Sequence, residues 1–117
     1  MQNDNESWDK HAMKILNACT KQKGAFYFME PVDPAKFNIM DYFDIVTVPM
    51  DFGTIKKRLV HNFYKDASQF VGDMKLVWDN CYKYNGVQHI VSKSANEVEN
   101  YFSEQVKISG FYKFLEN

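Results

Sequence analysis

The chain is poor in cysteine, with only Cys19 and Cys81 among its 117 residues. Neither belongs to a Cys-x-x-Cys pair. Each falls on an apolar stripe of a predicted helix, where a free thiol acts as a small hydrophobic side chain. A chain of this length can build one core without disulfides, so we expect a single domain over residues 1–117. Two free buried thiols suit a reducing compartment.

The sequence also lacks an excess of charge of either sign. It has 14 basic and 15 acidic residues, and a formal net charge of -1 argues against a dedicated nucleic-acid binder. No apolar run approaches the roughly 20 residues that cross a bilayer, so no membrane partner is expected. The first ten residues, MQNDNESWDK, are polar and predict neither a signal peptide nor a transit peptide.

Metal-ligand patterns are missing as well. The three histidines, His11, His61 and His89, lie far apart in the sequence and show no ligand spacing. We therefore expect neither a metal nor another cofactor.

Proline is scarce outside one segment. All three prolines fall within residues 24–50, where no helical period persists. A loop this long is usually either functional or disordered, and many aromatic side chains argue against disorder. We therefore expect residues 24–50 to form a functional loop with these large apolar side chains: Phe26, Tyr27, Phe28, Met29, Val32, Phe37, Ile39, Met40, Tyr42 and Phe43.

Amphipathic helices are predicted on both sides of this loop. Asp51 is placed to cap one of them, and Asp66 with Gln69 three residues later resembles a capping box at the start of another. Four such helices with one long connection predict an all-α helical bundle. The predicted helices cover residues 7–21, 51–62, 66–85 and 91–110.

The third predicted helix ends in an anomaly. Asn85 falls on the same face as Phe70, Met74, Trp78 and Cys81, so its amide points among apolar side chains. An unpartnered buried amide costs about 1–3 kcal/mol, and something must therefore satisfy it. One interpretation is that Asn85 caps the end of the helix. The other is that it supplies the polar group of an apolar ligand pocket walled by the aromatic loop.

Four sequence blocks, in this order and with these gaps, resemble the bromodomain family. A single block would be weak evidence, but four with matching spacing are specific, and the resemblance covers about residues 8–114. The blocks are FMEPVD (28–33), DYFDIV (41–46), PMDFGTI (49–55) and NCYKYN (80–85).

The resemblance implies a left-handed four-helix bundle, with helices called Z, A, B and C and a long ZA loop between the first two. It also implies a non-catalytic nuclear module, monomeric as an isolated domain, that reads acetylated lysine on histone tails or other proteins in chromatin. Asn85 matches the asparagine that donates to the acetyl carbonyl, and Tyr42 the tyrosine that holds the same oxygen through a water. The other matched positions are Phe28 and Val32 on the shelf, Phe37 and Ile39 in the loop, Cys81 and Tyr84 on helix B, and the gatekeeper Val91 on helix C.

Physical chemistry favours the same ligand. Acetyl-lysine is a neutral amide on an apolar stem, which suits a dry pocket with one donor. We expect no carboxylate inside the site, so an unmodified lysine would bury its ammonium at considerable cost. Between residues 30 and 51 the loop contains one basic residue, Lys36, and five acidic ones, which predicts an acidic rim around the site. The acidic residues are Glu30, Asp33, Asp41, Asp44 and Asp51.

Two positions depart from the family pattern. The usual Trp-Pro-Phe shelf reads Phe26-Tyr27-Phe28, which makes the rim smaller at Phe26 and adds a hydroxyl at Tyr27. Met40 stands where a proline often precedes Asp-Tyr, which loosens the loop. Both departures bear on which peptide is preferred.

Two other classes of function remain open. Cys81, His89 and Asn85 could form a cysteine-hydrolase trio, although Cys81 has no helix N-terminus or nearby cation to lower its pKa. The alternative to an acetyl-lysine reader is a helical interaction module that binds a partner helix in an apolar groove. Such a module would not discriminate between acetylated and plain peptides.

Overall fold

The computed structural model describes residues 7–115, and every regular element in that range is helical. The all-helical bundle predicted from the sequence is confirmed. The elements in chain order are α1 (Trp8–Thr20), the 3₁₀ helix η2 (Lys23–Phe28), α2 (Tyr42–Ile45), α3 (Phe52–Val60), α4 (Ala67–Asn85), α5 (Ile90–Ser109) and the 3₁₀ helix η3 (Phe111–Leu115).

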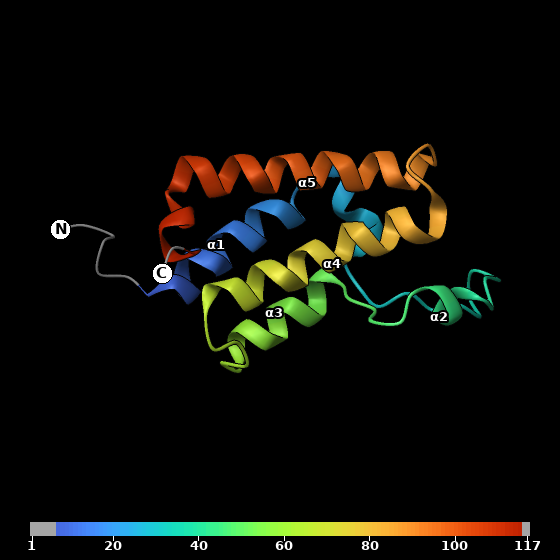
Figure 1. Ribbon diagram of the computed structural model, residues 1–117, viewed down its shortest axis with the longest axis horizontal. Helices are drawn as coiled ribbons and strands as arrows, with labels where there is room; N and C mark the ends of the chain where they lie inside the picture. The colour runs from blue at the N-terminus through green and yellow to red at the C-terminus, as the bar shows by residue number, and fades with distance from the viewer. Residues whose placement is uncertain (1–6, 116–117) are drawn as a thin grey trace.

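The four longer helices, α1, α3, α4 and α5, pack lengthwise into an elongated bundle with principal extents of 51 × 26 × 25 Å (Figure 1). The long loop that carries α2 and the short turn between α4 and α5 lie at the same end of the bundle. α1 begins and α5 ends at the opposite end (Figure 1). Two segments far apart in the sequence thus meet at one end of the molecule.

Capping residues set the starts of α3 and α4. The Asp51 carboxylate accepts from the Thr54 backbone N–H at 2.9 Å, and the Asp66 carboxylate accepts from the Gln69 N–H at 3.0 Å. The Gln69 side chain reaches back to the Lys65 N–H at 2.8 Å, which completes a reciprocal cap. Both helices therefore begin where their predicted caps place them.

Every helix end except the end of α4 differs by one or two residues from the sequence-based bounds. α3 ends at Val60 rather than at Asn62, because Asn62 takes a left-handed conformation with a φ of 56°. α5 begins at Ile90, capped by the ring of His89, which accepts from the Val91 N–H. It ends before Gly110, whose φ of 80° suits a residue without a side chain.

The segment 24–50 is not an unbroken loop, in contrast to the prediction. It contains most of η2 and the single turn α2, and elements of one or two turns are too short to leave a helical period in the sequence. The terminal helix η3 was missed for the same reason. Its Phe111 is fully buried, with its ring centroid 5.9 Å from that of Phe70.

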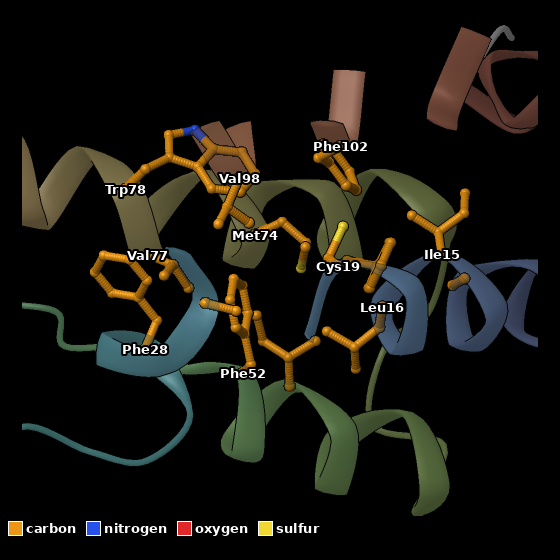
Figure 2. Packing of buried hydrophobic residues seen from close by; sticks show 14 of the residues in the cluster. Ile15, Leu16, Cys19, Phe28, Phe52, Met74, Val77, Trp78, Val98 and Phe102 are labelled. Carbon is orange, nitrogen blue, oxygen red and sulfur yellow. The ribbon is translucent and has the colours of Figure 1, made fainter. Parts of the chain in front are cut away.

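The core runs along the bundle and includes two residues of the loop region, Ala25 and Phe28. Phe28 reaches from η2 into the core and meets Phe52 of α3 edge-on, with ring centroids 6.2 Å apart (Figure 2). Because Phe28 is 8% exposed, it anchors η2 to the bundle. Figure 2 also shows Cys19 among the core side chains, where burial raises the pKa of its thiol to about 12. Cys19 and Cys81 are both free and buried.

No helix in the part of the chain that the structure describes is long and apolar enough to cross a bilayer.

Candidate functional site

A pocket of about 240 Å³ opens between the long loop and the facing ends of α4 and α5. Its lining is mostly apolar, with few polar groups, as is usual for sites that take a small uncharged ligand. Four segments of the chain contribute to it. The lining residues are Tyr27, Phe28, Glu30, Val32, Phe37, Ile39, Tyr42, Met50, Asp51, Val77, Cys81, Tyr84, Asn85 and Val91.

All but one of the site residues proposed from the sequence line this single pocket. The exception is Phe26, which is 79% exposed and lies outside the lining, with its ring edge-on to Tyr27 at 5.5 Å between centroids. Four lining residues were not among those proposed for binding: Met50 and Val77, which were not expected at the site, and Glu30 and Asp51, which were expected only at the rim.

Asn85 is the last residue of α4 and is half-buried at the pocket. Its Nδ2 donates to the Cys81 sulfur at 3.6 Å, and Gly86 rather than Asn85 occupies the C-cap position. Thioether and thiol sulfurs are weak acceptors, so this bond satisfies the amide poorly. A stronger acceptor that enters the pocket would therefore replace the sulfur as the partner of the Asn85 amide.

The wall beside Asn85 is buried and uncharged. The Cys81 sulfur contacts the Ser92 hydroxyl at 3.7 Å, and Ser92 is 1% exposed. Burial raises the pKa of the Cys81 thiol, while its bonds to Ser92 and Asn85 oppose this shift. The thiol is thus neutral and acts as an apolar wall.

Tyr42 and Tyr84 also line the pocket and contact each other. Their ring centroids lie 5.0 Å apart, and Tyr84 donates its hydroxyl to the Asp41 carboxylate at 2.6 Å. This hydrogen bond raises the pKa of the Tyr84 phenol, and burial raises the pKa of the Tyr42 phenol. Both tyrosines therefore stay protonated and keep a hydroxyl group to donate.

Asn80 is a buried polar residue of α4 whose burial the helical pattern did not predict. At 3.6 residues per turn, Asn80 lies on the face of α4 opposite the apolar stripe, where an exposed side chain is expected. Its side chain is nevertheless buried, and its Nδ2 donates to the Val48 carbonyl at 2.8 Å. The bond ties the far part of the loop to α4. The one signal in the sequence was that Asn80 opens the same six-residue block that Asn85 closes.

The expectation of a site without carboxylates is wrong, because Glu30 and Asp51 both line the pocket. Asp51 is buried, and its two oxygens accept from the backbone N–H and the hydroxyl of Thr54, at 2.9 and 2.6 Å. Glu30 is exposed, so water screens its charge. Loop residues have no period, and the sequence alone could not assign their side chains to the inside or outside of the pocket.

A close backbone approach sets the distance between η2 and α5. A Cβ added at Gly24 would lie 2.7 Å from the Ser94 carbonyl oxygen, so only glycine fits there. This contact brings Tyr27 and Phe28 to the same pocket as Val91, one turn earlier on α5. A side chain at position 24 would push η2 away from α5 and so move this wall of the pocket.

The contacts do not form a catalytic trio. The bonds of the Cys81 sulfur go to Ser92 and Asn85, and the His89 ring accepts from the Val91 backbone. A thiol whose pKa is raised by burial is a poor nucleophile at neutral pH. Within residues 7–115 no group of three or more histidine, cysteine or acidic side chains could hold a metal ion.

Comparison with known protein families matches residues 12–97 to the family described as Bromodomain. Among curated proteins, the chain is 38% identical over 98 residues to the "SWR1 complex bromodomain subunit bdf1" of Schizosaccharomyces pombe. It is 34% identical over 97 residues to "Bromodomain-containing factor 2" of Saccharomyces cerevisiae. These alignments cover 84% and 83% of this chain, but only 17% and 15% of the relatives.

Proposed function

The chain belongs to the bromodomain family, and from this premise we propose that it binds Nε-acetylated lysine in the pocket between the long loop and the α4–α5 turn. In this proposal Asn85 donates to the acetyl carbonyl, and Tyr42 holds the same oxygen through a water. The apolar stem of the ligand lies against Phe28, Val32 and Val91.

The observation that carries the proposal is the state of Asn85. Its amide lies in an apolar pocket and donates a hydrogen bond to a sulfur, which is a weak acceptor. A carbonyl oxygen is a better partner, and an acetyl group presents one without bringing a charge into the pocket. Acetyl-lysine meets both requirements.

We propose acetylated histone tails, or other acetylated proteins, as the partners. The names of the two relatives support a role in chromatin, since one is a subunit of the SWR1 complex, and such a role requires a nuclear location. In this proposal the domain works as a monomer, without catalysis, cofactor or direct contact with nucleic acid. The chain spans less than a fifth of each relative, so the activities of the longer proteins are not assigned to it.

The test is a calorimetric titration with matched histone-tail peptides that differ only in acetylation of one lysine. We expect the acetylated peptide to bind at least about tenfold more tightly, because an ammonium would lose its hydration in an apolar pocket. Glu30 is the one exposed carboxylate at the pocket, and its screened charge should only partly offset this loss. Equal affinity for both peptides would favour the helical interaction module instead.

The acidic rim gives a second prediction. Glu30, Asp33, Asp41 and Asp44 are exposed on the loop, whereas Asp51 is buried against Thr54. Exposed charges steer a basic peptide, and salt screens them. We therefore expect the association rate of a basic acetylated peptide to fall as salt rises.

The variant Glu30→Gln should slow association about two- to threefold at low salt and have little effect at high salt. Glu104→Gln is the matched control, because Glu104 is exposed on α5 and lies fourteen residues beyond the helix start at the pocket. Stopped-flow kinetics at two salt concentrations would measure both. An association rate that does not depend on salt would count against steering by the rim.

A further inference from the structure

Asp41 lies outside the pocket lining but holds one of its walls. Its carboxylate accepts the Tyr84 hydroxyl at 2.6 Å, across 43 residues of sequence. The Tyr84 ring in turn packs against Tyr42, with ring centroids 5.0 Å apart. Tyr42 and Tyr84 both line the pocket, so a single hydrogen bond connects the loop wall to the α4 wall.

The loop needs such a connection because α2 cannot hold itself. Four residues form only one turn, and an isolated helix of that length is unstable in water. Its internal bonds run from Asp44 N–H to the Asp41 carbonyl and from Val46 N–H to the Tyr42 carbonyl. Asp41 thus begins the turn with its backbone and fastens it to α4 with its side chain.

The residues around this turn supply little other restraint. Met40 and Phe43 are 73% and 54% exposed, so neither packs firmly against the bundle. The next polar tie along the loop is the bond from Asn80 to the Val48 carbonyl, beyond the end of α2. Between these two ties, the buried Tyr42 and Val46 are the side chains that keep α2 against the bundle.

We propose that the Asp41–Tyr84 hydrogen bond is a positioning contact that holds Tyr42 in its binding position and thereby sets the affinity for the acetylated ligand. The inference rests on the proposed function, since it concerns the same pocket. It adds Asp41, a residue that does not line the pocket, to those that determine affinity. Tyr84 acts through its hydroxyl as well as through its ring.

Three variants test the contact. Tyr84→Phe removes the hydroxyl and keeps the ring, Asp41→Ala removes the acceptor, and Asp41→Asn keeps an oxygen that can accept from the hydroxyl. Tyr82→Phe is the matched control. Tyr82 lies on the same helix and donates to the Glu99 carboxylate at the same distance of 2.6 Å, but it does not line the pocket.

The first measurement needs no ligand. Hydrogen exchange of the Tyr42, Asp44 and Val46 amides should become about three- to fivefold faster in Tyr84→Phe and in Asp41→Ala, while amides of α4 and α5 stay unchanged. The second is titration with the acetylated peptide, whose affinity should fall about three- to fivefold in the same two variants. Asp41→Asn should keep amide exchange and peptide affinity close to those of the wild type. The double variant Tyr84→Phe/Asp41→Ala should show no larger change than either single variant, because both remove the same hydrogen bond.

Unchanged exchange and unchanged affinity in Tyr84→Phe would overturn the proposal. Weaker binding with normal loop exchange would also overturn it, because the hydroxyl would then contact the ligand directly. A wild-type protein that does not bind acetylated peptides would refute the proposed function and with it the role of this contact in affinity. The exchange data would then still decide whether the bond orders α2.

Discussion

Replacing Asn85 with alanine is expected to lower the affinity for an acetylated peptide about tenfold or more while leaving the melting temperature nearly unchanged. In the free protein, alanine gives up only a weak bond to the Cys81 sulfur. In the complex, the acetyl oxygen loses its donor yet is still stripped of water, a loss of about 1–3 kcal/mol. Binding and folding should therefore separate at this residue.

Asn85→Asp should bind acetyl-lysine less well than the alanine variant, because a carboxylate repels the carbonyl that it must meet. A thermal melt and a peptide titration on each variant make the comparison. Asn100→Ala is the control, since Asn100 is exposed on α5 and its amide bonds only to the neighbouring Asn96. An Asn85→Ala protein that melts several degrees lower yet binds normally would return Asn85 to the role of a helix cap.

The opposite result, a loss of stability larger than the loss of binding, is expected for Asn80, five residues earlier in the same helix. Asn80→Ala should reduce the free energy of unfolding by about 1–3 kcal/mol, because the buried Asn80 amide no longer donates to the Val48 carbonyl, which is left without its partner. For a domain of this size such a loss lowers the melting temperature by about 4 °C or more. Affinity for the peptide should fall less than in Asn85→Ala, since Asn80 does not line the pocket.

Chemical denaturation together with a thermal melt would measure this loss, again against Asn100→Ala. The result that contradicts it is a variant as stable as the wild type, which would mean that the loop holds its place without Asn80. Two asparagines of one helix would then differ in burial but not in their importance to the fold.

The helices were predictable from the sequence because their signals are local. Asp51 and Asp66 cap α3 and α4 through bonds to residues three positions away, and Gly110 ends α5 through its own conformation. Such contacts span a few residues and leave a trace in any short window. Elements of one or two turns, such as α2 and η3, leave none.

The site was predictable only in part, because its bonds join distant segments. The apolar position of Asn85 follows from the helical period, and the loop wall follows from the resemblance to a family. The burial of Asn80 depends on a carbonyl 32 residues away, and the bond of Tyr84 on a carboxylate 43 residues away. No window of sequence contains these pairs, and the same gap explains why the carboxylates of Glu30 and Asp51 were not expected in the pocket.

The arrangement of the bundle also determines how the domain can be attached to something else. α1 begins, and α5 passes into η3, at the end of the 51 Å molecule away from the pocket (Figure 1). A tether joined before α1 or after η3 therefore leaves the mouth of the pocket facing outward. Protein immobilised on a sensor surface through either end of the chain would keep its pocket turned away from the surface. A fluorophore attached at either end would not obstruct an incoming peptide.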